Sequence, residues 1–176
     1  MAFAEFQQRK LQRLKWYDYS NPGHYFVTVC TKSPEYFFGK VVNKKMKIND
    51  AGKMISELLV NLHKVFQNIK LDQFVVMPNH IHAIINILDV NNRAATESRP
   101  YKISLSDIIG RLKSYSTQRY IKNIELNNWL PFERKLWQRS FYDHIIKTDV
   151  ELRFIRKYIK NNPENWEKDE FYIPDI

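Results

Sequence analysis

Two apolar runs separated by a proline–asparagine dipeptide, FVVMPNHIHAIINI at residues 74–87, constrain the fold more than any other segment. The dipeptide is typical of a tight turn, and a tight turn joins antiparallel strands. Side chains alternate along a strand, so His80 and His82 share one face with Ile84 and Asn86. The other face is apolar throughout, which predicts a strand covered by protein on both sides.

The remaining patterns surround these two strands with further strands and helices. Turn residues, apolar alternation and helix caps at Asn49 or Asp50, at Ser104 or Ser106, and at Thr148 mark the boundaries. Pro163 predicts that the last helix ends by Asn162. The expected order is strand 24–32, a strand region or hairpin at 37–49 around Asn43 and Lys44, helix 51–66, strands 71–78 and 80–88, helix 105–124, strand 141–146 and helix 149–162. Short links between several strands favour an α+β fold with an antiparallel, ferredoxin-like sheet.

The whole chain of 176 residues is expected to form one domain. We divide it into a basic arm (1–16), a core (17–166) and a peripheral, acidic tail (167–176). A single cysteine, Cys30, excludes a disulfide framework and a cysteine-rich zinc site, and fits a reducing cytoplasm. The sequence has no long apolar stretch, so we expect no membrane partner. The net charge of +9 favours a polyanionic partner such as nucleic acid.

The histidine pair admits two interpretations. Both imidazoles can converge on one metal ion, or each can simply hydrogen-bond to backbone or water inside a strand. A metal site needs a third ligand, and spacing alone does not choose it. The candidates are the amides near the last helix and Asp72, Asp143, His144 and His63.

A second candidate site lies on the last helix. Tyr158 and Asn162 are four residues apart, which places them within about 40° of each other on one helix face. A tyrosine can act as a nucleophile where nearby cations stabilise its phenolate. The alternative roles are a packed aromatic for Tyr158 and a C-cap for Asn162. Tyr115 is a competing nucleophile, but Arg119 stands where a partner amide would be.

Three segments in this order, DYSNPGHYFVTVCT, FVVMPNHIHAIINI and LWQRSFYDHIIKTDVELRFIRKYIKNNPENW, resemble the single-tyrosine transposases of the HUH superfamily, closest to the REP-associated tyrosine transposases. The family's metal-binding histidine pair falls on His80 and His82, its nucleophile on Tyr158 and its amide ligand on Asn162. The resemblance implies a ferredoxin-like fold with the tyrosine helix packed across the sheet.

The implied activity is metal-dependent cleavage and rejoining of single-stranded DNA near hairpins through a 5′-phosphotyrosine intermediate. The implied cofactor is a divalent metal, Mg²⁺ or Mn²⁺. Two successive cleavages require either a homodimer or re-use of the same tyrosine. Two alternatives remain open: a non-catalytic nucleic-acid-binding module of the same fold, and a phosphodiesterase that uses water.

DNA contacts are expected from basic residues and from the aromatic residues Trp137, Phe141 and Tyr142, which could stack on unpaired bases. A solvated surface or a core position is the alternative for each of them. The candidates are Arg9, Lys10, Arg13 and Lys15 in the arm, Arg111, Lys113, Arg119 and Lys122 on the long helix, and Trp137 and Arg139 in the loop after it.

Overall fold

The computed structural model describes residue 14 and residues 16–89 and 102–174. The expected basic arm therefore lies outside the described residues, apart from its positions 14 and 16. Among the described residues, no helix is both long enough and apolar enough to cross a membrane.

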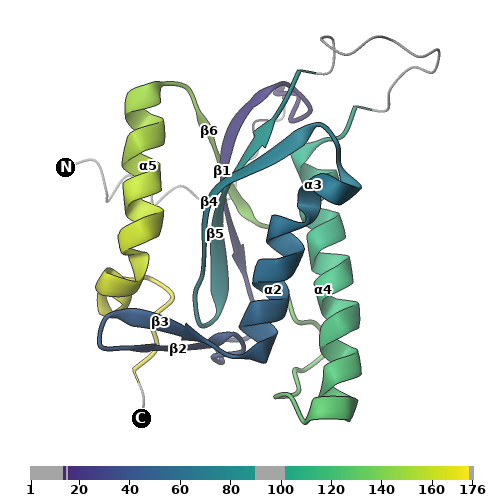
Figure 1. The fold of residues 1–176 in the computed structure, drawn as a ribbon, viewed down its shortest axis with the longest axis vertical. Helices are drawn as coiled ribbons and strands as arrows, with labels where there is room; N and C mark the ends of the chain where they lie inside the picture. The colour runs from purple at the N-terminus through teal and green to yellow at the C-terminus, as the bar shows by residue number, and fades with distance from the viewer. Residues whose placement is uncertain (1–13, 15, 90–101, 175–176) are drawn as a thin grey trace.

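A four-stranded antiparallel sheet forms the middle layer, in the order β4-β5-β1-β6 (Figure 1). Its strands are β1 (Gly23–Cys30), β4 (Ile69–Val76), β5 (His80–Ile87) and β6 (Tyr142–Ile146). Without the hairpin that follows β1 and the short helix α3 (Leu62–Val65), the chain order up to β6 is β1-α2-β4-β5-α4-β6. The helices α2 (Asp50–Val60) and α4 (Leu105–Asn127) both cover one face. This connectivity and strand order are those of the expected ferredoxin-like α+β fold.

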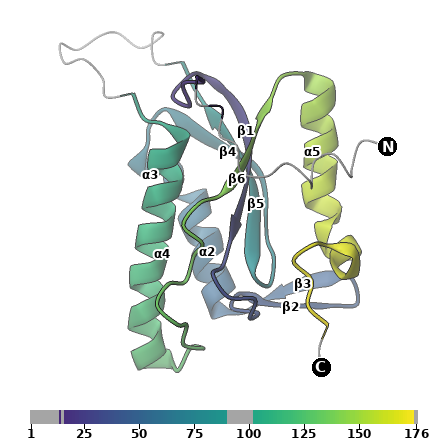
Figure 2. The same ribbon diagram turned by 180° about the vertical axis from the view of Figure 1, so that it is seen from behind.

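The helices divide between the two faces of the sheet, as Figures 1 and 2 show from opposite sides. Helices α2 (Asp50–Val60), α3 (Leu62–Val65) and α4 (Leu105–Asn127) lie on one side, and α5 (Asp149–Asn161) lies alone on the other. Asn49, Ser104 and Thr148 cap α2, α4 and α5 with their side chains, which confirms the predicted helix starts.

A small hairpin, β2 (Gly39–Val42) and β3 (Lys45–Ile48), forms a separate two-stranded sheet with its turn at the expected Asn43 and Lys44. At the other end of the chain, α5 ends at Asn161, which confirms the prediction from Pro163, but the chain does not leave the helical path. The 3₁₀ helix η2 (Asn162–Lys168) continues from α5, because proline lacks the N–H that an α-helix interior uses but is tolerated in a first turn.

Strand β5 is buried on both faces, as its sequence predicts. Ile81, Ala83, Ile85 and Ile87 pack into the main core under α2 and α4. Ile84 instead joins a smaller cluster under α5, with Ile146, Leu152, Ile155 and Ile159. The alternation of one strand thus places His80 and His82 on the side of the sheet that faces α5.

Candidate functional site

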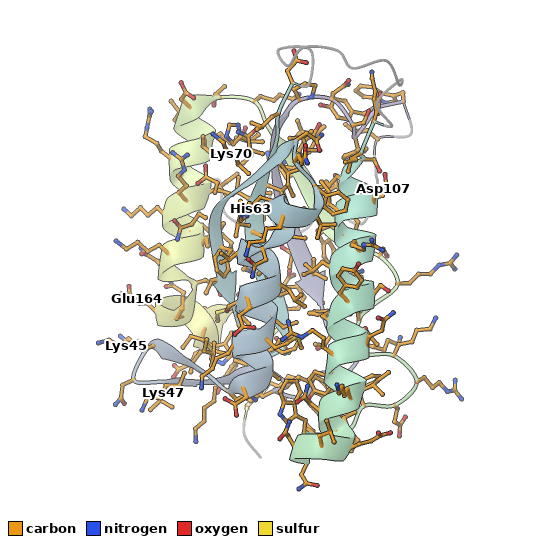
Figure 3. The ribbon with its side chains drawn as sticks, turned by 45° about the vertical axis from the view of Figure 1, so that its right-hand side comes forward. Lys45, Lys47, His63, Lys70, Asp107 and Glu164 are labelled. Atoms are coloured by element: carbon orange, nitrogen blue, oxygen red, sulfur yellow. The ribbon has the colours of Figure 1, made fainter. Side chains whose placement is uncertain are left out.

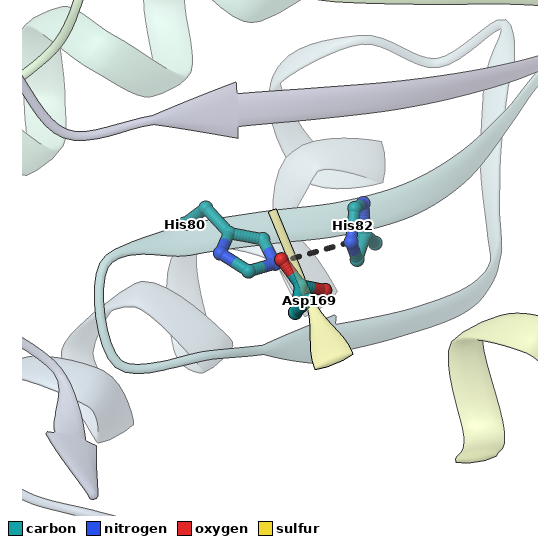
Figure 4. A group of neighbouring side chains, drawn as sticks. All are labelled: His80, His82 and Asp169. Atoms are coloured by element: carbon teal, nitrogen blue, oxygen red, sulfur yellow. Dashed lines mark hydrogen bonds between the residues drawn. The ribbon is translucent and has the colours of Figure 1, made fainter. Parts of the chain in front are cut away.

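The two histidines point toward each other on β5, near the turn from β4 (Figure 4). Their Nε2 atoms are 3.1 Å apart, and the exposed fractions of His80 and His82 are 0% and 2%. Neither ring is a loose surface histidine. Each is fixed by the strand on one side and by packed neighbours on the other.

Hydrogen bonds at the Nδ1 atoms orient both rings. His80 Nδ1 lies 3.0 Å from Asn79 Oδ1, and His82 Nδ1 lies 2.8 Å from Thr28 Oγ1. The amide oxygen of Asn79 can only accept, so His80 donates from Nδ1 and its Nε2 carries a lone pair. The same Asn79 amide donates from Nδ2 to the carbonyl oxygen of Phe171 at 2.8 Å. These partners direct the Nε2 atoms to one point, as outer partners of metal-bound histidines do.

Burial keeps both imidazoles uncharged. It lowers the pKa of His82 to about 3 and, together with the neighbouring His82, lowers the pKa of His80 well below its ordinary value. A neutral imidazole is the form that binds a metal ion. At neutral pH neither ring carries a positive charge that would repel a cation.

Tyr158 reaches the same point from α5. Its hydroxyl oxygen lies 3.3 Å from His82 Nε2, and its ring meets those of His82 and Phe26 edge to face. Burial raises the pKa of the Tyr158 phenol, and the nearby Asp169 and Glu170 carboxylates raise it further. A hydrogen bond with Asn162 acts in the opposite direction. The phenol is therefore protonated at neutral pH unless positive charge is added.

Helix α5 holds Tyr158 in place through an apolar stripe, one ion pair and one side-chain hydrogen bond. Leu152, Ile155 and Ile159 are the buried residues of the helix and pack on the sheet. Arg156 pairs with Asp72 on β4, with its Nε 2.9 Å from Asp72 Oδ1. Glu151 Oε1 lies 2.6 Å from His144 Nε2 on β6. The helix is thus tied to both edge strands of the sheet.

Two further oxygen-bearing side chains complete the site. A carboxylate oxygen of Asp169 and one ring nitrogen from each histidine all lie within 4.8 Å of one another. Asn162 is 2% exposed and donates from Nδ2 to Asp169 Oδ2 at 3.3 Å. Its Oδ1 is buried and has no hydrogen-bond partner among the described residues. Such an orphaned acceptor costs free energy unless a ligand satisfies it.

These residues fit a divalent cation. Two nitrogen ligands at about 2.1 Å from one ion and at a right angle to each other, as an octahedral ion prefers, stand about 3 Å apart. The two Nε2 atoms are 3.1 Å apart. Burial raises the pKa of the Asp169 carboxyl, although hydrogen bonds from Phe171 N–H and Asn162 oppose it, so this group also gains from a nearby positive charge.

Comparison with known proteins identifies the family to which this chain belongs. The sequence matches the family described as transposase IS200 like over residues 24–162, a range that includes both histidines, Tyr158 and Asn162. The chain belongs to the IS200-like transposase family. A protein of Haemophilus influenzae (strain ATCC 51907 / DSM 11121 / KW20 / Rd) described as uncharacterised is 34% identical over 180 residues, which cover 97% of this chain and 96% of that protein.

A solved structure shares the fold of this IS200-like transposase. It is that of a REP-associated tyrosine transposase bound to a REP hairpin, with a TM-score of 0.56 and 16% identity. The match covers 93% of this chain and 76% of the other. The expected α+β fold and the expected family are both confirmed.

The other ligand and nucleophile candidates of this transposase lie elsewhere. Tyr115 is on α4, on the opposite side of the sheet, where the Arg111 guanidinium stacks on its ring at 4.5 Å. His63 is on α3, where its side chain is exposed (labelled in Figure 3). Asp72 and His144 hold α5, and Asp143 is not part of the cluster that the structure describes.

The expected DNA-binding residues occupy several kinds of position. Arg9, Lys10, Arg13 and Lys15 lie outside the described residues. Arg119 is 3.6 Å from Glu57, and Arg111, Lys122 and Arg139 are exposed. Their part in DNA binding remains a prediction.

Two of the expected DNA contacts are used inside the protein. The amine of Lys113 donates to the carbonyl oxygens of Gln138 and Ser140 at 2.9 and 2.8 Å, which ties α4 to the following loop. Trp137 is 4% exposed, and its indole donates to Ser116 Oγ in the main core. In this arrangement neither ring face of Trp137 is open to a base.

Sequence reasoning missed Asp169 because it treated residues 167–176 as peripheral. The chain after η2 turns back onto β5, where the ring of Phe171 packs on His80 with centroids 4.7 Å apart. The signal in the sequence was the mixture of aromatic and acidic residues in DEFY (169–172), which differs from a solvated tail. Only the fold could place that segment, because nothing in the sequence gives the direction of the chain after Pro163.

Proposed function

We propose that this member of the IS200-like transposase family cleaves and rejoins single-stranded DNA near hairpins through a 5′-phosphotyrosine intermediate. One observation carries the proposal: the Tyr158 hydroxyl lies 3.3 Å from His82 Nε2, at the edge of a buried cluster of neutral imidazoles and a carboxylate. A partly buried phenol whose oxygen lies beside a group of potential metal ligands suits a nucleophile better than a packing residue.

The proposed step is an in-line displacement at phosphorus. The Tyr158 oxygen forms a bond to the phosphorus atom while the bond from phosphorus to the 3′ oxygen breaks. The phenol loses its proton, and the departing 3′ oxygen gains one and becomes a hydroxyl. The phosphodiester is exchanged for a phosphotyrosine ester, so the reverse reaction with another 3′-hydroxyl rejoins DNA without ATP.

His80, His82 and the oxygen atoms of Asn162 and Asp169 are the residues that would hold a divalent metal, Mg²⁺ or Mn²⁺. Bound there, the ion would polarise the scissile phosphate and stabilise the phenolate and the developing negative charge. Thr28 and Asn79 orient the imidazoles, and Phe26 holds the tyrosine ring. Asn162 would act as a ligand through its unsatisfied Oδ1.

The placement of α5 bears on how many subunits act. Tyr158 faces the histidines of its own chain, and the Arg156–Asp72 ion pair and the His144–Glu151 hydrogen bond of α5 also stay within the chain. We therefore favour re-use of the same tyrosine for successive cleavages over a homodimer that exchanges its last helix. The solved relative is bound to a REP hairpin, which supports hairpin DNA as the substrate class.

Denaturing gels of the protein with a 5′- or 3′-labelled hairpin oligonucleotide and Mn²⁺ test the proposal. We expect a covalent protein–DNA adduct for the parent protein and none for Tyr158→Phe, with cleavage reduced on the order of 10⁶-fold, the loss caused by removing a hydrolase nucleophile. Tyr115→Phe is the matched control, because it removes the same hydroxyl from α4, and it should form the adduct normally.

The same gels separate the alternatives. Cleavage without adduct, unchanged in Tyr158→Phe, would indicate a phosphodiesterase that uses water. Hairpin binding with neither cleavage nor adduct at any metal concentration would indicate a non-catalytic binding module. Adduct formation that persists in EDTA would contradict the proposed role of the metal but not the role of Tyr158.

A further inference from the structure

The β2–β3 hairpin carries an unusual concentration of positive charge. Its ten residues, GKVVNKKMKI (39–48), contain four lysines and no acidic residue. All four are exposed. In the part of the chain that the structure describes, none of their amines is paired with a carboxylate. They are Lys40, Lys44, Lys45 and Lys47.

Two features of this hairpin oppose its own stability. Lys40 is directly opposite Lys47 in the antiparallel register, and like charges in that position repel. Lys45 projects from the same face, two residues along the strand. At the turn, Asn43 and Lys44 both have positive φ, 51° and 61°. A turn of this kind favours glycine after asparagine, so lysine at position 44 is the strained choice.

The hairpin is nevertheless held firmly at its base. Gly39 has a φ of +129°, and a Cβ at this position would lie 2.2 Å from the Lys47 carbonyl oxygen, so only glycine allows the strands to close there. The Asn49 side chain, which caps α2, also donates to the Phe37 carbonyl oxygen at 2.9 Å. The lysines are thus presented by a fixed support.

The hairpin also lies next to the candidate active site. Strand β3 packs against η2, the helix that begins with Asn162 and leads to Asp169. Figures 1 and 2 both show the hairpin beside the C-terminal end of α5. Figure 3 shows Lys45 and Lys47 on the hairpin, pointing away from the body of the protein.

We propose that the β2–β3 hairpin binds the phosphate backbone of the DNA whose scissile phosphate enters the site at Tyr158. A row of phosphates removes the repulsion between Lys40 and Lys47 and gives the strained Lys44 a partner. Contacts of this kind are independent of base sequence, so the hairpin positions the strand and does not select it. The proposal rests on the proposed function, because it takes DNA as the substrate.

Salt dependence of DNA binding tests the hairpin directly. Fluorescence anisotropy with a hairpin oligonucleotide that carries a single-stranded flank gives the slope of log K against log salt concentration. Each lost contact to a single strand should make the slope shallower by about 0.7. The triple variant Lys40→Gln, Lys45→Gln, Lys47→Gln should therefore be shallower by about 2. An unchanged slope would overturn the proposal.

Lys44→Gly provides an internal check on folding. Glycine relieves the turn, so Tm should rise while the salt slope becomes shallower by about 0.7. A loss of binding in a protein of higher Tm cannot come from unfolding. If Tm rises and the slope stays at the parent value, Lys44 does not contact DNA and the proposal fails for the turn.

Lys47→Glu and Lys64→Glu form a matched pair. Both change the net charge by the same amount, but Lys64 lies on α3, beyond the opposite end of α2 from the hairpin. In Lys47→Glu the new carboxylate should pair with the amine of Lys40. This variant should lose at least tenfold more DNA affinity than Lys64→Glu does. Equal weakening would indicate a general charge effect. The adduct assay on the parent protein tells the two proposals apart, because a parent that forms the adduct leaves only the hairpin in question.

Discussion

The two faces of the four-stranded sheet are built for different tasks, although β5 contributes to both. The face under α2 and α4 is a continuous apolar core. The face under α5 has a small apolar cluster and, beside it, buried polar side chains: Thr28, His80, His82 and Asn162. Polar groups in such positions cost stability unless each is satisfied. The first face therefore supplies the stability that allows the second to hold a reactive site.

The largest expected effect comes from a substitution on the face of the sheet under α5. His82→Gln keeps a polar side chain of similar size beside Thr28 but removes the imidazole. Loss of a residue that only orients a metal ligand lowers activity by about 10–100-fold. Cleavage by His82→Gln should fall by more than this, because the candidate ligand itself is lost. Tm should stay close to that of the parent. The adduct assay, calorimetric titration with Mn²⁺ and a thermal melt measure the three quantities.

A histidine of the edge strand is the control for this experiment. His144→Gln removes an imidazole that pairs with Glu151 and lies outside the metal cluster. It should bind Mn²⁺ as the parent does. Normal Mn²⁺ binding by His82→Gln would show that the α5 face is not a metal site, whatever happens to cleavage.

The next largest effect comes from a substitution on the opposite face, in the main core under α2 and α4. Ile85 is fully buried in the main core, so Ile85→Ala should lower the free energy of unfolding by about 2–5 kcal/mol. The fraction that remains folded should still bind Mn²⁺ normally. Urea denaturation measures the first quantity, with Val150→Ala on the exposed surface of α5 as the control that changes it by no more than about 0.5 kcal/mol. A loss of Mn²⁺ affinity in the folded fraction would mean that the two faces are not independent.

The smallest effect compares two surface ion pairs, one on each side of the sheet. Asp72→Asn breaks the pair with Arg156 of α5, and Glu57→Gln breaks the pair with Arg119 of α4. Both should change the free energy of unfolding by about 1 kcal/mol or less, since such pairs are partly exposed. Only Asp72→Asn should slow adduct formation, by about tenfold or less, because it loosens the helix that carries Tyr158.

Equal rates for these two variants would show that the Asp72–Arg156 pair does not position the tyrosine. Adduct formation at saturating DNA is the measurement, because it follows the chemical step and not the affinity for the oligonucleotide.

The sequence predicted most of what depends on local patterns. The antiparallel strands around Pro78 and Asn79, the hairpin turn at Asn43 and Lys44, and the helix caps are encoded within a few residues, and all of them form. The shared face of His80 and His82 follows from strand alternation alone. The meeting of that face with Tyr158 was expected only from the family resemblance, because 76 residues separate Tyr158 from His82.

Other features of the site could not be read from local patterns. Asp169 and Phe171 reach β5 only because η2 continues α5 and then reverses the chain, which the Pro163 signal does not reveal. Trp137 looks like a stacking residue beside Arg139, but its indole donates inward to Ser116. Burial of an aromatic residue in a loop depends on which helix the loop returns to, and the sequence does not fix that.

The alternation along β5 also has a consequence for how the family can evolve. Positions 81, 83, 85 and 87 maintain the core, whereas 80 and 82 carry the candidate chemistry. Substitutions at 80 and 82 can therefore remove the reaction and leave a protein that still folds. A single inserted residue would exchange the two sets and place both histidines in the apolar core. Descendants that lose activity yet keep the fold should accordingly arise by substitution in this strand, and insertions or deletions within it should be purged.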